Sequence, residues 1–336
     1  MDRPVLLTGA SGFLGAHLAR ELLLRGYRVR VLLRPGAPDG TLAGLDLERC
    51  VGDVLRADSV RRAAEGCGAI VHAAASTQVN PARDPAIWAV NLTGTEHVVG
   101  AALAVGVGRL VYVGTANVCG FGPLEQPGDE TTPFAGSRYG SDYIDSKRAA
   151  TERVLRAVRE EGLPAVLVHP TFLLGPLDAK PSSGRLLLEL HAGRIVGYPA
   201  GGKNYVHVRD VAVAAVNALT QGRIGESYLL GHQNLSYRDA FALMARRMRV
   251  PPPRWPIPPP LARFYGWASE GWSRLRGRPA RVNRAMTALA NDGHYFDCRK
   301  AIAELALPQT PLAEAIDEAF AWFTQNGYGI EYARRR

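Results

Sequence analysis

Three glycines spaced three residues apart, in the stretch LLTGASGFLG at residues 6–15, constrain the fold of this chain more than any other feature. An apolar run, residues 5–7, comes directly before them, and an apolar-periodic stretch, residues 13–25, follows. A glycine-rich turn between a strand and a helix lets backbone amides approach a phosphate, and the helix N-terminus adds a dipole that favours the anion. The turn therefore indicates a phosphate-containing cofactor, with a plain tight turn as the alternative.

Each glycine has a separate expected role. Gly9 permits the turn, Gly12 the approach of the phosphate, and Gly15 the close packing of helix on strand. The spacing GxxGxxG is one residue longer at its start than the dinucleotide fingerprint GxGxxG, so the motif needs support from its context.

Strand-like and helix-like stretches alternate through the first half of the chain, which predicts a parallel sheet covered by helices on both faces. After about Leu173 the pattern loosens into short helices and a proline-rich stretch, residues 250–260. We expect a Rossmann-type, doubly wound α/β fold with a smaller, mainly helical substrate-binding part at the C-terminus. The expected dinucleotide-binding domain covers residues 1–172, with 203–230 returning to it, and the substrate-binding part covers 173–202 and 231–336. The expected strands are 5–8, 28–34, 48–53, 69–75, 109–115 and 165–169, and the expected helices are 13–25, 58–66, 84–105, 141–161, 211–220, 237–248 and 312–325.

Charge and cysteine usage bound the class of protein. The chain of 336 residues carries a net charge of +9, and its arginines are densest after Arg246. Such a surplus suits nucleic acid, a membrane surface or an anionic small molecule, with a solvated basic surface as the alternative. Neither the four cysteines nor the eight histidines show metal-ligand spacing, so we expect no metal site. The N-terminus lacks a secretory signal and no apolar run is long enough to span a bilayer, so we expect a cytoplasmic location.

The end of the second expected strand bears on the choice of cofactor. An acid there favours the free ribose 2′-hydroxyl of NAD(H), whereas an arginine accommodates the 2′-phosphate of NADP(H). The strand ends in Leu32-Leu33-Arg34, which favours NADP(H). Asp39 lies close by in the sequence and keeps NAD(H) as the alternative.

A tyrosine and a lysine stand four residues apart in the stretch SDYIDSKRAA. On a helix, Tyr143 and Lys147 lie on one face, one turn apart. A phenol titrates near pH 10, too high for proton transfer at neutral pH, and a neighbouring ammonium lowers its pKa. The pair is therefore a candidate proton donor or acceptor, with an ordinary surface pair on an amphipathic helix as the alternative.

Together these motifs resemble the extended short-chain dehydrogenase/reductase superfamily, the NAD(P)-dependent epimerase/dehydratase-like group. The resemblance covers nearly the whole chain. Its motifs, in order, are TGASGFLG, GDV at 52–54, HAAA at 72–75, NLTGT at 91–95, VYVGT at 111–115, YIDSK at 143–147 and YVHVRDVA at 205–212.

The resemblance implies a role for each matching residue. Tyr143 would be the general acid or base, Lys147 would bind the nicotinamide ribose and lower the pKa of Tyr143, and Thr115 would orient the substrate carbonyl. The implied cofactor contacts are Gly9, Ser11, Gly12, Phe13 and Leu14 at the pyrophosphate, Arg34 at the 2′-phosphate, Asp53 and Val54 at the adenine, Ala73, Ala74 and Ala75 near the centre, and Pro170 and Phe172 at the nicotinamide carboxamide.

Three positions depart from the family pattern. Gly114 stands where a serine is usual, Cys119 where sugar-modifying members often have tyrosine, and His169 where arginine is frequent. The first two weaken the transfer of a sugar-specific site. We interpret His169 as a buried, hydrogen-bonded histidine rather than a catalytic one.

Three functions fit these residues. The first is an NADP(H)-dependent enzyme that reduces a ketone, or oxidises the matching alcohol, on a bulky hydrophobic substrate such as a sterol, flavonoid or β-keto compound. The second is a nucleotide-sugar epimerase or dehydratase that retains NAD. The third is an NADP sensor without catalysis. The C-terminal pattern resembles the branch of dihydroflavonol-4-reductase-like, 3β-hydroxysteroid dehydrogenase-like and 2-alkyl-3-oxoalkanoate reductase-like enzymes, which favours the first.

An aromatic stripe follows the proline-rich stretch. In LARFYGWASEGWSRLRG, residues 261–277, large apolar side chains fall near one helical face. We interpret the stripe as core, while a cap over a hydrophobic pocket or a peripheral membrane contact are the alternatives. The residues of the stripe are Leu261, Phe264, Tyr265, Ala268, Trp272 and Leu275.

The resemblance to the superfamily also implies a homodimer that forms through helices 84–105 and 141–161.

Overall fold

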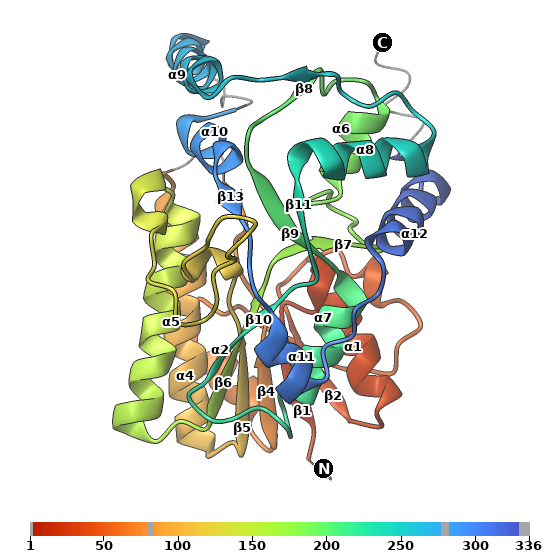
Figure 1. Ribbon diagram of the computed structural model, residues 1–336. Coiled ribbons are helices and arrows are strands. Elements are labelled where there is room, and N and C mark those ends of the chain that lie inside the picture. The colour runs from red at the N-terminus through yellow and green to blue at the C-terminus, as the bar shows by residue number, and fades with distance from the viewer. Residues whose placement is uncertain (1–2, 80–82, 277–281, 329–336) are drawn as a thin grey trace.

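The computed structural model describes residues 3–79, 83–276 and 282–328. Its main sheet is parallel throughout, with the strand order β10-β6-β5-β4-β1-β2-β3 (Figure 1). The order reverses between β1 and β4, and ligands of open α/β sheets bind at such a switch point. The strands are β1 Val5–Thr8, β2 Val29–Leu33, β3 Glu48–Val51, β4 Ala69–His72, β5 Arg109–Val113, β6 Ala165–Pro170 and β10 Ser227–Leu230.

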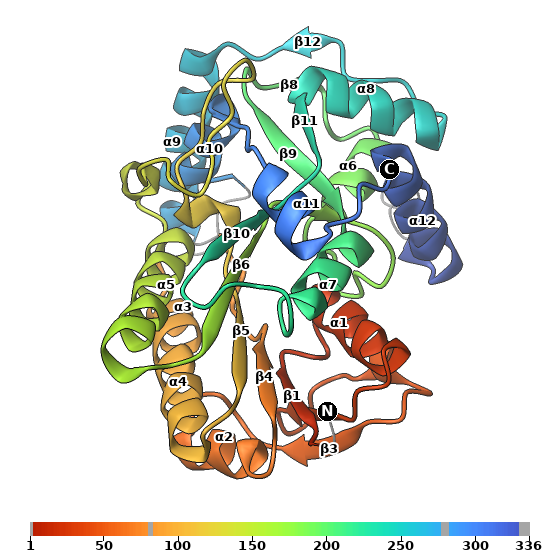
Figure 2. The ribbon, with the colours of Figure 1, turned by 60° about the horizontal axis from the view of Figure 1, so that its bottom comes forward.

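Helices cover both faces of this sheet, which confirms the Rossmann-type fold. Alternate residues of β1 serve opposite faces, since Val5 and Leu7 belong to one core cluster and Leu6 to the other. Figures 1 and 2 show α1 and α7 on one face and α2, α4 and α5 on the other. The bounds are α1 Phe13–Leu24, α2 Ala57–Ala64, α4 Gly94–Val105, α5 Asp142–Glu161 and α7 Val208–Asn217.

The helix expected over residues 84–105 is interrupted. It consists of α3 (Pro85–Trp88), a π-helical segment (Ala89–Thr93) and α4. Asp84 caps the first turn by accepting a hydrogen bond from the Ala86 amide at 2.9 Å. A π-helical turn often marks a functional region, and this one contains Asn91, which is buried and hydrogen-bonded to Ser76 and Ser146.

A second, smaller sheet lies beyond the carboxyl ends of the main strands (Figure 1). This sheet was not predicted from the sequence, because its strands are short and several of them are polar. Its central strand β9 pairs with β7, β11 and β13, and α6, α8 and α12 pack against it around a separate core cluster. The bounds are β7 Phe172–Leu174, β9 Gly202–His207, β11 Gln233–Ser236, β13 Gly293–His294, α6 Arg185–His191, α8 Tyr237–Met248 and α12 Leu312–Gln325.

The remaining elements lie outside the two larger sheets. Strands β8 and β12 form a parallel pair, and α9 and α10 form a helical pair at the end of the molecule opposite the N-terminus (Figures 1 and 2). The division of the chain into two domains stays a prediction. The bounds are β8 Gly197–Tyr198, β12 Trp255–Pro256, α9 Pro259–Arg276, α10 Arg284–Asn291, α11 Arg299–Leu305, and the short 3₁₀ turns Gly40–Leu42, Ala116–Val118 and Gly136–Tyr139.

Candidate active site

The glycine turn forms a cradle that side chains would fill. Gly9 has a φ of +75°, and a Cβ there would lie 2.6 Å from the backbone of Ala73. A Cβ at Gly15 would lie 2.0 Å from the Gly9 carbonyl oxygen, so only glycine allows this contact between helix and turn. Helix α1 begins at Phe13 with no side-chain cap and no acid in its first turn, which leaves its amides for an anion. The cradle fits the pyrophosphate of a dinucleotide.

The segment after β4 is fixed to the same turn. The Thr8 hydroxyl lies 2.7 Å from Nδ1 of His72, and it accepts a hydrogen bond from the Ala74 amide at 3.3 Å. Nε2 of His72 lies 3.1 Å from the hydroxyl of Thr95 on α4. Burial lowers the pKa of His72 to about 3, so its ring is neutral. This chain of contacts holds Ala73, the first residue after β4, beside Gly9.

The residues expected near the adenosine end lie at neighbouring strand ends. Arg34 follows β2 and is exposed, and among the described residues no carboxylate pairs with it. Asp39, the nearby acid, instead lies 3.7 Å from Nε of Arg49. The Asp53 carboxylate, after β3, accepts a hydrogen bond from the Leu55 amide at 3.0 Å. Val54 is buried.

Tyr143 and Lys147 lie on the first turns of α5, and Thr115 follows β5. The hydroxyl of Thr115 lies close enough to the phenol of Tyr143 to influence its pKa. The Lys147 ammonium is buried, donates a hydrogen bond to the Val113 carbonyl at 2.7 Å, and lies 4.6 Å from the ring centroid of Tyr112. The fold therefore brings the end of β5 and the start of α5 together.

The electrostatics of this group follow from burial. Burial raises the pKa of Tyr143 above its ordinary value, and the polar interaction with the nearby Thr115 hydroxyl acts in the opposite direction. Burial lowers the pKa of Lys147 to about 7. In this structure the pKa of Tyr143 is thus raised rather than lowered, and a lowering by Lys147 stays a prediction.

A small cavity of about 50 Å³ opens beside Thr115. Its lining includes Pro170 and Phe172, the residues expected at the nicotinamide, and also Lys203 and His294. The polar hydrogen-bonding groups of this cavity suit a carbonyl or hydroxyl compound. The full lining is Thr115, Ala116, Asn117, Pro170, Thr171, Phe172, Lys203, Asn204, His294 and Phe296.

Two of these side chains were missed by the sequence analysis. Lys203 and His294 are register partners on β9 and β13, so they stand on one face of the small sheet. Nζ of Lys203 lies 5.6 Å from the ring centroid of Phe172, and no carboxylate among the described residues pairs with it. Burial lowers the pKa of Lys203 to about 8. His294 stacks on Phe121 with ring centroids 4.1 Å apart. Their separation by 91 positions leaves no signal in the sequence.

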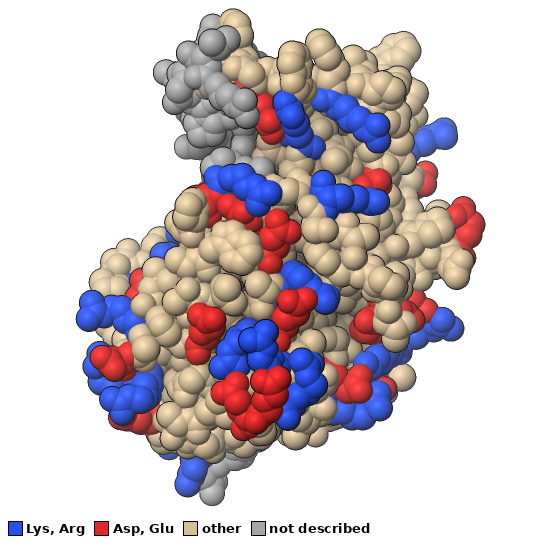
Figure 3. All heavy atoms as spheres, turned by 90° about the vertical axis from the view of Figure 1, so that its left-hand side faces the viewer, with Lys and Arg blue, Asp and Glu red and all other residues tan. Residues whose placement is uncertain are grey.

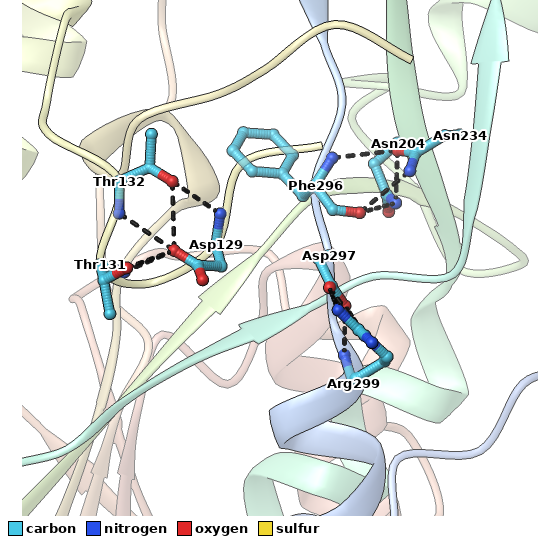
Figure 4. A network of polar contacts seen from close by, with 8 residues as sticks. All are labelled: Asp129, Thr131, Thr132, Asn204, Asn234, Phe296, Asp297 and Arg299. Atoms are coloured by element: carbon cyan, nitrogen blue, oxygen red, sulfur yellow. Dashed lines mark hydrogen bonds and ion pairs between the residues drawn. The ribbon is translucent and has the colours of Figure 1, made fainter. Parts of the chain in front are cut away.

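A polar network holds the chain segment that carries Phe296 (Figure 4). Asn234 pairs with its backbone, because its amide donates to the Phe296 carbonyl at 3.0 Å and its oxygen accepts from the Phe296 amide at 3.0 Å. Asn204 donates to Asn234 at 2.9 Å. The Asp297 amide donates to the Gly128 carbonyl at 2.8 Å, which joins this segment to the turn where Asp129 accepts from Thr131 and Thr132 (Figure 4). Hydrogen bonds to the backbone of Phe296 and Asp297 therefore hold in place the segment that lines the cavity with Phe296.

The two departures at Gly114 and His169 have one physical cause. A Cβ at Gly114 would lie 2.2 Å from Nδ1 of His169, so the histidine ring occupies the space of a larger residue at 114. His169 is buried, Nε2 lies 3.1 Å from the Ser227 hydroxyl, and Nδ1 has no partner in the described part of the chain. Burial lowers its pKa to about 3. Its side chain is therefore neutral and only half satisfied.

The aromatic stripe on α9 is not core, and this interpretation was wrong. Leu261, Phe264 and Tyr265 are more than half exposed, and so is Trp272. The buried residues of this helix are small, Ala262 and Gly266 among them, and they allow the helix to lie close to α10. The side chain of Leu275 lies outside the described residues.

Comparison with known proteins places the site in a wider context. The family model described as "NAD dependent epimerase/dehydratase family" matches residues 5–231. The chain is similar to sterol demethylase protein B of Methylococcus capsulatus, with 32% identity over 96% of this chain and 98% of that one. It is similar to the crystal structure of gox2253, with 34% identity, a TM-score of 0.87, and coverage of 97% and 99%. A nucleoside-diphosphate-sugar epimerase from Pseudomonas aeruginosa gives 30% identity, a TM-score of 0.81, and coverage of 98% and 99%.

Proposed function

Because this chain belongs to the NAD-dependent epimerase/dehydratase family, of the extended short-chain dehydrogenase/reductase type, and is an NAD(P)-dependent oxidoreductase, we propose that it acts on a carbonyl. It reduces a ketone, or oxidises the matching secondary alcohol, on a bulky hydrophobic substrate such as a sterol, flavonoid or β-keto compound. The observation that carries this proposal is the placement of Thr115, which lines the cavity, close to Tyr143 at the start of α5, with Lys147 one turn along the same helix. The sterol-related name of one relative supports the apolar class of substrate.

The proposed mechanism assigns proton handling to the chain itself. A bound nicotinamide supplies the hydride in reduction and accepts it in oxidation. The hydroxyl of Thr115 donates a hydrogen bond to the carbonyl oxygen, and Tyr143 Oη delivers the proton to the same oxygen. In oxidation the phenolate of Tyr143 takes the hydroxyl proton. The Lys147 ammonium, when charged, stabilises that phenolate.

Tyr143→Phe tests this assignment. We expect a loss of turnover of about 10²–10⁴-fold, because the ring remains while the proton donor is removed. The dissociation constant for NADPH should change less than about threefold, which nicotinamide fluorescence measures. Tyr198→Phe, a matched change on β8 outside the cavity lining, should leave both values unchanged. Full activity of Tyr143→Phe with every carbonyl substrate tested would contradict the mechanism.

We propose NADP(H) as the cofactor. Arg34 is exposed at the end of β2 and has no carboxylate partner among the described residues, which leaves its guanidinium for a 2′-phosphate. The competing acid, Asp39, faces Arg49 instead. Both observations support NADP(H) over NAD(H).

Arg34→Asp tests this preference. We expect the KM for NADPH to rise at least about tenfold and the KM for NADH to change little, because only NADPH carries the 2′-phosphate. Arg28→Asp makes the same charge change at the opposite end of the same strand, where it is also exposed, and serves as the control. An equal loss for both cofactors would remove the argument.

One observation favours a second candidate, a nucleotide-sugar epimerase that retains NAD. The Lys203 ammonium faces the cavity without a described carboxylate partner and suits an anionic substrate, and a similar solved structure carries an epimerase name. Purified protein distinguishes the two functions. Net oxidation of NADPH with ketones supports the reductase, whereas tightly held NAD and interconversion of UDP-sugars without net cofactor use support the epimerase.

A further inference from the structure

Helix α9 places its small residues inward and its aromatic residues outward. Ala262 and Gly266 are buried, and a Cβ at Gly266 would lie 2.7 Å from the hydroxyl of Thr287 on α10. The large side chains therefore face away from the helix that covers α9. An ordinary amphipathic surface helix buries its apolar stripe, so the reverse arrangement calls for a partner outside the fold.

The exposed side chains belong to β12 and α9, which lie at the end of the molecule opposite the N-terminus (Figures 1 and 2). We call them the α9 aromatic patch. Several large exposed apolar side chains on one segment of a monomer indicate an interaction site, and the rings of Phe264 and Trp267 are neighbours, with centroids 6.1 Å apart. The patch consists of Trp255 (72% exposed), Leu261 (57%), Phe264 (61%), Tyr265 (55%), Trp267 (57%) and Trp272 (58%).

The same stretch of chain has a surplus of positive charge, although Arg247 on α8 pairs with Asp317 on α12. Residues 246–276 contain seven arginines and one acidic residue, a net +6 out of +9 for the whole chain. Arg254 and Arg263 are exposed and have no carboxylate partner among the described residues. The acid, Glu270, faces Arg284 at 3.3 Å. In Figure 3, acidic and basic side chains alternate over the lower half of the face, whereas basic and uncharged side chains prevail in the described atoms near the top.

We propose that the α9 aromatic patch binds the surface of an anionic lipid bilayer, with α9 lying in the interface. Tryptophan, tyrosine and phenylalanine favour the headgroup level of a bilayer, and arginines nearby attract anionic headgroups. Among the described residues no helix has the length and apolarity needed to cross a membrane, so the contact is peripheral. The proposal is independent of the substrate assigned above.

The charge of the patch argues against other occupants. In a two-fold dimer through this face, each basic segment would meet its own copy, and like charges would oppose each other. Single-stranded nucleic acid binds grooves that track its backbone, whereas the aromatic rings of α9 are exposed on the surface of a helix. An anionic bilayer offers an interface for the aromatic rings and anionic headgroups for the arginines.

Vesicle co-sedimentation of the full chain tests the proposal. We expect binding to vesicles of phosphatidylglycerol and phosphatidylcholine, at least tenfold weaker binding to phosphatidylcholine alone, and partial release at high salt. Phe264→Ser/Trp267→Ser should weaken binding at least tenfold, and so should Arg254→Glu/Arg263→Glu. Leu24→Ser/Ile224→Ser removes two exposed apolar side chains elsewhere and should bind like the natural protein.

A second measurement does not depend on any variant. Brominated lipids in the vesicles should quench the tryptophan fluorescence of the natural protein, since Trp255, Trp267 and Trp272 belong to the patch. Absence of both sedimentation and quenching with anionic vesicles overturns the proposal. It is also overturned if light scattering shows a dimer that the patch variants dissociate, or if the patch binds RNA and not vesicles.

Discussion

At the scale of single residues, Gly114 and His169 depend on each other. The sequence shows them as two unrelated departures from a family pattern, 55 positions apart. The structure places the histidine ring where a side chain at 114 would stand. A neutral, buried ring therefore fills the space beside residue 114, where β5 ends next to β6.

This dependence predicts a coupled effect on stability. Gly114→Ala should lower the free energy of unfolding by about 1–3 kcal/mol, because its Cβ would overlap His169 Nδ1. In the background of His169→Ala the same change should cost less than about 0.5 kcal/mol. Urea unfolding of the four proteins measures this as a double-mutant cycle. Equal costs in both backgrounds would show that the overlap is not the cause.

The residues of the candidate site differ in how well the sequence finds them. The glycine motif and the Tyr143–Lys147 spacing are local patterns, so the sequence finds them directly, at the end of β1 and at the start of α5. Lys203 and His294 meet only through a parallel pairing of β9 with β13. Such a pairing joins distant segments and leaves no periodic trace.

At the scale of elements, the π-helical segment joins three parts of the site. Asn91 is buried there, accepts a hydrogen bond from the Ser76 amide at 2.8 Å, and donates to the Ser76 carbonyl at 3.0 Å. It also donates to the Ser146 hydroxyl on α5 at 3.0 Å. A single amide thus fixes the segment after β4 relative to the helix of Tyr143.

Asn91→Ala should therefore affect both stability and activity. The variant leaves the buried partners of Asn91 without hydrogen bonds, which should lower the free energy of unfolding by about 1–3 kcal/mol. Urea unfolding measures this loss as a lower midpoint concentration of urea, with an unchanged dependence of the free energy on urea concentration. Turnover should fall as well, because α5 loses an anchor. Asn326→Ala, an exposed asparagine after α12, is the control and should leave both unchanged. A fully active, fully stable Asn91→Ala would show that the other contacts of α5 suffice.

The helices and strands differ in how well sequence patterns predict them. Most strands of the main sheet are buried on both faces and appear as apolar runs, so six of its seven strands could be predicted along the chain. Strand β3 is largely exposed, and β10 was not predicted as a strand. The small sheet could not be predicted, since Gln233–Ser236 is polar and Gly293–His294 has two residues. On α9 the periodicity was found but not its direction, because small residues such as Gly266 also make a packing face.

At the scale of the whole molecule, buried neutral histidines make stability depend on pH. Burial lowers the pKa of His17 to about 4 and those of His72 and His169 to about 3. The unfolded chain binds these protons near pH 6.5, before the folded protein does. The part of the free energy of unfolding that these neutral histidines contribute is therefore fully present above pH 6.5. It is lost as the pH falls toward 4 and below.

His17→Gln tests this dependence. Nε2 of His17 lies 2.9 Å from the Pro176 carbonyl, and a glutamine can keep a donor there. Between pH 6.5 and 4, the free energy of unfolding of the natural protein should fall more steeply, by up to about 1.4 kcal/mol per pH unit, than that of the variant. Chemical unfolding at several pH values measures both slopes. Parallel slopes would mean that His17 takes up its proton equally in both states.

The strand β10 belongs to the main sheet although residues 227–230 follow much of the small sheet in the chain. On a ribosome, β6 emerges long before its outer neighbour exists. Until residue 230 has been synthesised, the apolar stretch AVLVHP is an open edge, available for pairing with another nascent chain. A fragment that stops near residue 172 should accordingly aggregate, and expression yield should depend on how quickly translation carries the chain past β10.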